Sequence, residues 1–239
     1  MTTDLSSLPA CCAPLDHGWP LPWALPAARL VRTRFDPSLL QADDFSRHAV
    51  PPTRGVAKRQ SEFLAGRLCA RAALLRLTGE ASTPAAGADG APQWPEGVVG
   101  SITHSAGWAA VVVAPSNHYL GLGLDLEMLL SDERAERLAG QILTPNELQR
   151  LHTLPPEQHA QLVTLTFSFK ESLFKTLYPL VKKRFYFEHA ELLSWSPEGR
   201  ARLRLLLDLS ADWPAGRELD GQFSLFDGRV LSLVSVPNG

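Results

Sequence analysis

Two acidic side chains, Asp125 and Glu127, lie two residues apart within a run of alternating leucines. If residues 120–127 form a strand, both carboxylates point to one face, roughly 6.6 Å apart along the chain. Hard oxygen ligands at such a spacing suit Mg²⁺. Gly121 and Gly123 leave the same face without side chains, so a ligand would meet bare backbone there. The alternative is a polar strand face that happens to be acidic, and the pair alone favours that alternative.

A second set of candidate residues lies in a helix predicted over residues 156–178. Glu171 and Lys175 are four residues apart and therefore share a face, beside an apolar stripe. Glu171 offers a third metal ligand or a general base, and Lys175 offers an ammonium group for phosphate. The alternative is an ordinary helical ion pair of ~0.2–0.5 kcal/mol.

Two further segments carry groups that bind phosphate. Thr103 and His104 belong to a cluster of hydroxyls around an imidazole, which can donate hydrogen bonds to phosphate oxygens. Arg59 and Arg67 lie about two turns apart on a predicted helix, where guanidinium groups would bind a phosphate in bidentate fashion. The alternatives are a structural histidine and solvated surface arginines. A serine nucleophile is disfavoured, because no Gly-x-Ser-x-Gly elbow is present.

The elements that must position these groups form two similar halves, residues 1–118 and 119–239. The first half is predicted to contain a Pro-rich extended arm (1–28), a helix (58–77) stopped by Gly79, a loop (79–97), and two strands (98–102 and 108–114) around a turn at 103–107. The second half is predicted to contain the strand 120–127, a helix starting at Thr144, the helix 156–178 stopped by Pro179, and strands at 188–195, 200–207, 222–226 and 230–236. The predicted fold class is α+β, with a long helix on a small, largely antiparallel sheet in each half.

Composition narrows the classes of function. The chain has 239 residues, of which 45% are hydrophobic and 20% charged, as in globular proteins. Its 23 basic and 25 acidic residues give a net charge of −2, which argues against a nucleic-acid or anionic-membrane binder. Without a spanning apolar run or a signal peptide, a cytoplasmic location is expected.

The near-neutral total conceals an uneven distribution of charge. Residues 29–76 contain ten Lys and Arg against four Asp and Glu, whereas residues 119–157 contain three against seven. This pattern favours an anionic ligand on the first half and a cation on the second. Solvated surface charge without a function is the alternative.

Taken in order, three blocks resemble the signatures of the surfactin-type 4′-phosphopantetheinyl transferases. They are Gly-Ser-Ile-Thr-His-Ser (100–105), Gly-Leu-Asp-Leu-Glu (123–127) and Phe-Ser-Phe-Lys-Glu-Ser-Leu-Phe-Lys (167–175). The segments 59–67 and 94–97 look like the enterobactin branch of that family, and the resemblance covers about residues 47–180. It implies two halves related by a pseudo-twofold axis, with coenzyme A in a cleft between them. The adenosine and 3′-phosphate would lie on the first half, and the metal and the catalytic groups on the second.

The resemblance also implies the reaction and the roles of the candidate residues. A serine of an apo acyl or peptidyl carrier protein would receive the 4′-phosphopantetheine group of coenzyme A, with release of adenosine 3′,5′-bisphosphate. The implied ligands of Mg²⁺ (or Mn²⁺) are Asp125, Glu127 and Glu171, the implied pyrophosphate contacts are Lys175, His104 and Thr103, and the implied 3′-phosphate contacts are Arg59 and Arg67. Because a serine hydroxyl is a weak nucleophile, a base is also expected, and Glu171 is the candidate for it, directly or through a metal-bound water.

The loop before Trp94 departs from the pattern of the family. Residues 85–92 lack the basic residue that many relatives place near the nucleotide phosphate. Either another arginine, such as Arg54, replaces it, or the nucleotide is held more loosely.

The carrier protein is expected to dock on residues 131–160 through an apolar patch, for which core burial is the alternative. The patch consists of Leu138, Ile142, Leu143 and Leu148. A monomer is expected. The other functions that fit are a different Mg²⁺-dependent phosphoryl or nucleotidyl transferase and a non-catalytic carrier-binding module of the same fold.

Overall fold

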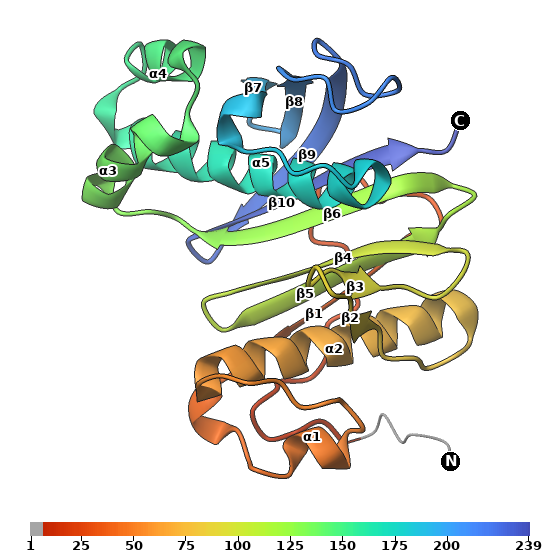
Figure 1. Ribbon diagram of the computed structural model, residues 1–239. Helices are drawn as coiled ribbons and strands as arrows, with labels where there is room; N and C mark the ends of the chain where they lie inside the picture. Colours follow the sequence, from red (N-terminus) through yellow and green to blue (C-terminus); the bar gives the residue numbers. More distant parts are fainter. Residues whose placement is uncertain (1–6) are drawn as a thin grey trace. The chain divides into compact units, whose positions relative to one another are not determined.

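The computed structural model describes residues 7–239, which divide into two compact units (Figure 1). The second unit contains residues 119–239 together with the short segment 20–24, which had been predicted to belong to the first half. Trp23 explains this correction: its backbone N–H donates to Gln222 Oε1 at 3.0 Å, and the Arg200 guanidinium lies 4.1 Å from its ring centroid. The first six residues of the predicted arm lie outside the described residues.

In the first unit, a long helix covers an antiparallel sheet. The strands are β1 (Arg29–Arg34), β4 (Val98–Ser105) and β5 (Trp108–Pro115), in the spatial order β1-β5-β4. The helix α2 (Ala57–Thr78) packs against them and ends at Gly79, whose φ of 81° explains why glycine stops the helix there. Residues 12 and 16 of the arm form bridges to Phe35 and Arg32, so the arm runs beside β1. The shorter elements are η1 (Pro37–Leu39), α1 (Asp44–Arg47), β2 (Ala85–Ala86) and β3 (Pro92–Gln93).

The hairpin between β4 and β5 is tighter than predicted. Residues 103–105 were expected in a turn, but they continue β4, and His104 pairs with Ala109. The turn consists of Ala106 and Gly107, with φ values of 45° and 80°. Two consecutive positive φ angles give a hairpin turn whose twist matches that of the strands, so the ladder extends to its last pair.

The second unit has the same plan with a larger sheet. Its strands are β6 (Tyr119–Met128), β7 (Ala190–Trp195), β8 (Arg200–Leu205), β9 (Glu218–Phe226) and β10 (Arg229–Pro237), all antiparallel in the order β6-β10-β9-β8-β7. The helices are α3 (Asp132–Ile142), α4 (Pro145–Leu151) and α5 (His159–Val181), with the 3₁₀ turns η2 (Pro156–Gln158) and η3 (Phe187–His189). Each unit is thus a long helix on an antiparallel sheet, which confirms the predicted α+β class.

Local sequence signals account for the ends of these helices, with one exception. Thr144 and Glu147 form a reciprocal capping box at the start of α4, as Thr144-Pro145 predicted. Pro179 was expected to stop α5, but the helix continues to Val181 and ends at Lys182, which has a φ of 50°. A proline removes one helical hydrogen bond, but its fixed φ is a helical one, so the chain can complete the last turn after it.

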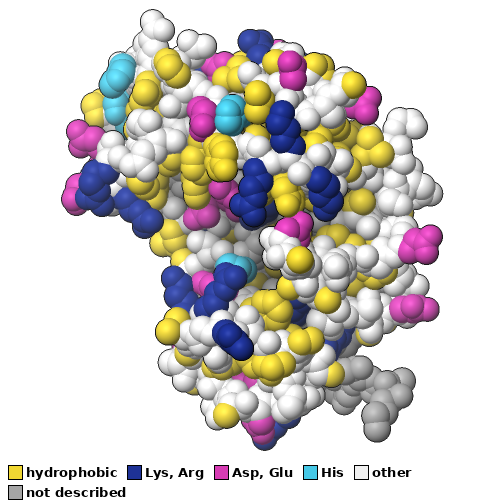
Figure 2. Space-filling view, viewed as in Figure 1, with side chains coloured by type: hydrophobic (Ala, Val, Ile, Leu, Met, Phe, Trp, Pro, Cys, Tyr) yellow, Lys and Arg dark blue, Asp and Glu magenta, His cyan; other side chains and the backbone are white. Residues whose placement is uncertain are grey.

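The surface is mixed in charge. On the face drawn in Figure 2, basic, acidic and apolar side chains are interspersed, as the balanced composition leads one to expect. Within residues 7–239, no helix combines the length and the apolarity needed to cross a lipid bilayer.

Candidate active site

The acidic strand face of β6 packs directly on α5. A Cβ atom added to Gly123 would lie 1.9 Å from the Ser172 carbonyl oxygen, and one added to Gly121 would lie 2.6 Å from the Thr176 carbonyl oxygen. The two glycines therefore allow a close approach, but of the helix backbone and not of a ligand as predicted. Their function is to bring the strand that carries Asp125 into register with the helix that carries Glu171.

Asp125 is held at the centre of this contact. Its side chain is 4% exposed; Lys175 Nζ lies 2.6 Å from Oδ1, and the Ser168 hydroxyl donates to Oδ2 at 2.9 Å. Ser168 and Ser172 also contact the Ser232 hydroxyl on β10, at 2.7 and 2.8 Å. A buried carboxylate is tolerable only with such partners, so Asp125, Ser168 and Lys175 form one preorganised group.

Glu171, on the same helix, is half-buried close to Asp125. Burial raises the pKa of Glu171, the negative charge of Asp125 raises it further, and the Lys175 ammonium opposes both. Glu127 is half-buried and shares the strand face of Asp125. The structure thus brings together Asp125, Glu171 and Lys175, three of the residues that the sequence singled out.

The donor chemistry of these carboxylates fits a hard cation, but the side chains do not enclose one in this arrangement. Across the described residues, no three His, Cys, Asp or Glu side chains converge closely enough to hold a metal ion. The Lys175 ammonium is the positive charge next to Asp125. Burial and the nearby charge of Asp125 raise the pKa of Glu171, and a cation between the two carboxylates would neutralise that crowded charge, which is the observation of this structure that favours a metal here.

In the first unit, the two candidate phosphate ligands on β4 point to opposite faces of the strand. His104 lies on the face covered by α2, and its side chain is 32% exposed. Thr103, the preceding residue, is buried on the other face. The alternation of side chains along the strand therefore separates Thr103 from His104, although the family resemblance implies that both contact the pyrophosphate.

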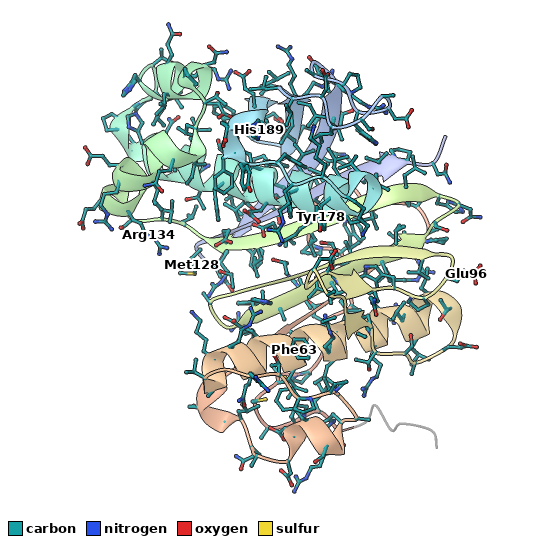
Figure 3. All side chains as sticks on the ribbon, viewed as in Figure 1. Phe63, Glu96, Met128, Arg134, Tyr178 and His189 are labelled. Carbon is teal, nitrogen blue, oxygen red and sulfur yellow. The ribbon has the colours of Figure 1, made fainter. Side chains whose placement is uncertain are left out.

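The two arginines of α2 are not equivalent either. Arg59 is exposed, whereas Arg67 is only 5% exposed and its guanidinium lies 4.5 Å from the centroid of Phe63 (labelled in Figure 3). Burial lowers the pKa of Arg67. Eight helical residues span roughly 12 Å, so the two guanidinium groups could share one phosphate only if their side chains reached toward each other along the helix.

The apolar patch predicted for carrier docking lies largely against the core of the second unit. Ile142 and Leu143 are 4% and 6% exposed and belong to the core of the second unit, and Leu138 and Leu148 pack against that core. The docking prediction was therefore wrong for Ile142 and Leu143, for which the core alternative holds, whereas Leu138 and Leu148 are only partly buried.

Because Ile142 is a core residue, Ile142→Glu should lower the free energy of unfolding by more than about 3 kcal/mol. Urea denaturation followed by circular dichroism measures this effect. Arg134→Glu, on the exposed side of the same helix, is the matched control and should change stability by less than about 0.5 kcal/mol. A folded Ile142→Glu variant of normal stability that binds carrier protein less tightly would restore the docking role.

A buried lysine next to Glu171 was not recognised from the sequence. Lys170 is 3% exposed, and its ammonium contacts Glu147 Oε2 at 2.6 Å, the Ile142 carbonyl at 2.7 Å and the Phe187 carbonyl at 2.9 Å. Burial lowers the pKa of Lys170, and the Glu147 charge opposes that shift. A lysine among phenylalanines on an apolar helix was the signal that could have revealed this buried ion pair.

Beside Glu171 lies a cavity of about 170 Å³ with aromatic walls. Phe174 lines it and stacks on Tyr178 at 5.1 Å between ring centroids (Tyr178 is labelled in Figure 3). Its other lining side chains include Phe185, Tyr186 and Phe187, with Lys170, Glu171 and Arg184 as the charged members. A titratable carboxylate at the edge of an apolar cavity is a common arrangement at active sites.

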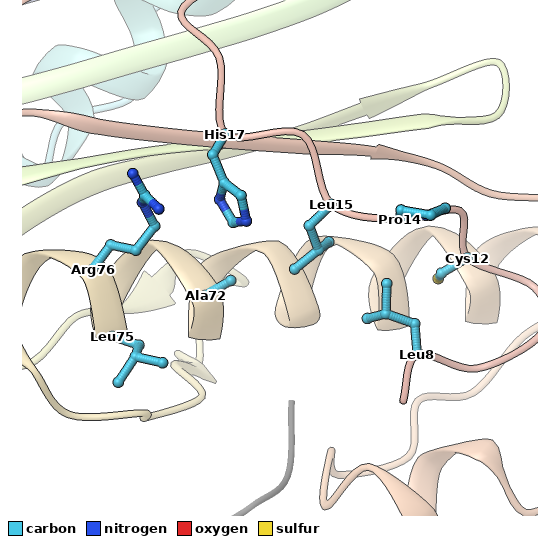
Figure 4. A pocket seen from close by; sticks show the side chains of 8 residues that line it. All are labelled: Leu8, Cys12, Pro14, Leu15, His17, Ala72, Leu75 and Arg76. Atoms are coloured by element: carbon cyan, nitrogen blue, oxygen red, sulfur yellow. The ribbon is translucent and has the colours of Figure 1, made fainter. Parts of the chain in front are cut away.

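A larger cavity in the first unit is separate from all of these residues. It has a volume of about 570 Å³ and lies between the arm and α2 (Figure 4). Its walls are mostly apolar, with His17 and Arg76 among the lining residues. None of the predicted site residues lines it, so its size alone does not make it the active site.

Comparison with known proteins decides the family. Residues 46–114 match the model of the 4′-phosphopantetheinyl transferase N-terminal domain, and residues 121–233 match that of the 4′-phosphopantetheinyl transferase superfamily. The chain belongs to the 4′-phosphopantetheinyl transferase superfamily. It is therefore an enzyme that transfers the 4′-phosphopantetheine group from coenzyme A to carrier proteins. The reading as a non-catalytic module is thereby excluded.

Individual relatives of this transferase agree with that assignment. The 4′-phosphopantetheinyl transferase Svp of Streptomyces mobaraensis is 36% identical over 90% of this chain and 86% of its own length. PptT of Mycobacterium tuberculosis is 33% identical over 76% of this chain and 81% of its own length. The enterobactin synthase component D of Salmonella typhimurium is 37% identical over 67% of this chain and 66% of its own length.

Proposed function

We propose that this transferase depends on Mg²⁺, for which Mn²⁺ substitutes, and that Asp125, Glu127 and Glu171 hold the ion. The observation that carries the proposal is the crowding of carboxylates in a partly buried place, because burial and then the charge of Asp125 raise the pKa of Glu171. The three carboxylates also supply the oxygen ligands that Mg²⁺ prefers. When bound, the ion would neutralise charge on the pyrophosphate of coenzyme A.

In the transfer step, the acceptor is a serine of an acyl or peptidyl carrier protein. Its hydroxyl oxygen attacks the β-phosphorus, the phosphoanhydride bond breaks, and adenosine 3′,5′-bisphosphate leaves. Glu171 accepts the hydroxyl proton. Lys175 donates to the pyrophosphate from its place beside Asp125.

The remaining contacts with coenzyme A are assigned to the first unit. His104 and Thr103 would bind pyrophosphate oxygens, and Arg59 and Arg67 the 3′-phosphate. Two observations support the arginines: Arg59 is exposed, and Arg67 Nε is buried without a hydrogen-bond partner, as expected for a guanidinium that acquires an anion. Thr103 is buried, whereas the His104 side chain is 32% exposed on the opposite face of the strand. His104 is therefore the more accessible of the two to a phosphate.

The aromatic cavity beside Glu171 suits the pantetheine arm. That arm is a flexible chain of apolar and amide groups, and Phe174 with Phe185 presents an apolar wall to it. Phe167 contacts Phe187, another lining residue, with 5.5 Å between ring centroids. The proposal also places the chain in the enterobactin branch, as a monomer in the cytoplasm.

One assay tests the metal and the acceptor together. The protein is mixed with coenzyme A and an apo acyl carrier or an apo peptidyl carrier, with Mg²⁺ or with EDTA, and the mass of the carrier is measured. Both carriers should gain one phosphopantetheine group with Mg²⁺, and EDTA should abolish the gain. A carrier with Ala in place of its acceptor serine is the control. Transfer that persists in EDTA would refute the metal proposal.

Glu171→Gln distinguishes the role of this carboxyl in catalysis from its effect on the stability of the folded protein. Loss of the base should lower kcat by about 100-fold or more. The raised pKa means that ionised Glu171 destabilises the folded state, a penalty that appears as pH rises through the ordinary glutamate range. Metal-free Glu171→Gln protein should therefore melt above the wild type at pH 8, and this difference should vanish near pH 4. Near-normal turnover would refute the role as base.

A further inference from the structure

Glu62 is a buried carboxylate in the first unit that has no role in the assignments above. Its side chain is 11% exposed, and its Oε2 lies 3.7 Å from Nδ1 of His104. A carboxylate removed from water to this extent requires a positive or hydrogen-bonding partner. The His104 imidazole is in position to be that partner.

The packing of α2 on β4 creates this contact. A Cβ atom on Gly66 would lie 3.0 Å from Ile102 Cγ2, so the helix approaches the strand closely at this point. Ile102 and His104 are two residues apart and share a strand face, while Glu62 and Gly66 are one helical turn apart. The glycine that meets Ile102 therefore brings Glu62 to His104.

We propose that Glu62 is a positioning residue for the transfer reaction: it holds the Nδ1 edge of His104 and thereby presents the Nε2 edge to a phosphate of coenzyme A. This proposal rests on the assigned role of His104 as a phosphate ligand. Because the two ring nitrogens lie on different edges, a carboxylate at Nδ1 fixes which edge is left for the substrate. The negative charge also favours the doubly protonated ring, whose Nε2–H donates to an anion more strongly than a neutral ring does.

The other side chains around His104 are consistent with this assignment. Across the sheet, His104 pairs with Ala109 on β5, and Ala109 in turn pairs with Thr33 on β1. Neither of these side chains carries a charge. One turn before Glu62 on α2 lies the exposed Arg59, whose positive charge acts against protonation of the ring. Of these groups, Glu62 is the one that favours a cationic His104.

The first experiment examines the ring itself, without any ligand. In ¹⁵N-histidine-labelled full-length protein at pH 7, the Glu62→Gln substitution should shift the His104 signals toward those of neutral imidazole. His48, a partly buried histidine of the same unit, is the internal control and should not change. Unchanged His104 signals in Glu62→Gln would overturn the proposal, whatever the role of His104 in catalysis.

The second experiment measures the dissociation constant of coenzyme A by calorimetry for wild type, Glu62→Gln, His104→Ala and the double variant. Glu62→Gln should weaken binding roughly fivefold with little change in kcat, and it should weaken it no further once His104 is absent. An equal loss in both backgrounds would overturn the proposal. Normal binding by His104→Ala would instead refute the phosphate role of His104, so the two failures are distinguishable.

A folding control accompanies both measurements. Glu62→Asp keeps the charge but withdraws it by one methylene, and it should give intermediate His104 signals and intermediate affinity. If Glu62→Gln does not fold, Glu62→Asp replaces it in both measurements, the His104 signals and the dissociation constant of coenzyme A. Wild-type signals and wild-type affinity in folded Glu62→Asp would then count against the positioning role.

Discussion

Asp125→Asn should lower kcat for carrier modification by on the order of 1,000-fold, which corresponds to about 4 kcal/mol of transition-state stabilisation. The substitution keeps the size of the side chain and an oxygen that accepts from Ser168. It removes the negative charge that lies 2.6 Å from Lys175 and that the proposed metal requires. The fold should persist, because the amide remains hydrogen-bonded in the same space.

Initial rates of phosphopantetheine transfer at saturating coenzyme A measure this effect. Asp220→Asn is a matched control in the same unit: Asp220 pairs with Arg202 at 2.9 Å, but its side chain is 78% exposed. That substitution should leave kcat unchanged, because an exposed ion pair contributes little. A loss of less than tenfold in Asp125→Asn would show that the charge at this position is not needed for transfer.

Gly123→Ala should lower the free energy of unfolding by about 3 kcal/mol or more, at the upper end of what overpacking costs. The added methyl group would lie 1.9 Å from the Ser172 carbonyl oxygen and 2.8 Å from the Thr176 backbone nitrogen. Backbone atoms cannot rotate away, so β6 and α5 must separate. Activity should fall with stability, because Asp125 and Glu171 lie on the two separated elements.

Gly140→Ala is the control for the general effect of replacing a glycine. Gly140 lies on α3, and an added Cβ would meet no atom within 4 Å. This substitution should raise stability by about 0.5–1 kcal/mol, since alanine favours a helix more than glycine does. Chemical denaturation of both variants distinguishes close packing from glycine flexibility. Equal stability of Gly123→Ala and the wild type would contradict the contact described here.

Much of the second unit follows from local patterns in the sequence. Alternation over residues 120–127 predicted β6 and correctly placed Asp125 and Glu127 on one face. Helical spacing predicted α5 and the proximity of Glu171 to Lys175, and Thr144 correctly marked the start of α4. These patterns are sufficient because each one depends on neighbours in the chain.

The features that were missed depend on contacts distant in sequence. Alternation shows that Gly123 has an open face, but not that a helix 49 residues later fills it; Ser172 supplies that contact. Ile142 fits either a docking patch or a core, and only the position of the rest of the unit decides. The contact of Glu62 with His104 and the threefold contact of Lys170 join segments whose proximity no short motif encodes.

The ammonium of Lys170 has a consequence for how the second unit fluctuates. It contacts residues 28, 23 and 17 positions away in the sequence, so the end of α3, the start of α4 and the turn η3 are fastened to α5 at one point. Breaking any one of these contacts would leave buried polar groups without partners. Local opening there should therefore be rare, and backbone amides near Lys170 should exchange with deuterium only when much of the unit unfolds. The helix that carries Glu171 would then be among the most slowly exchanging parts of the enzyme.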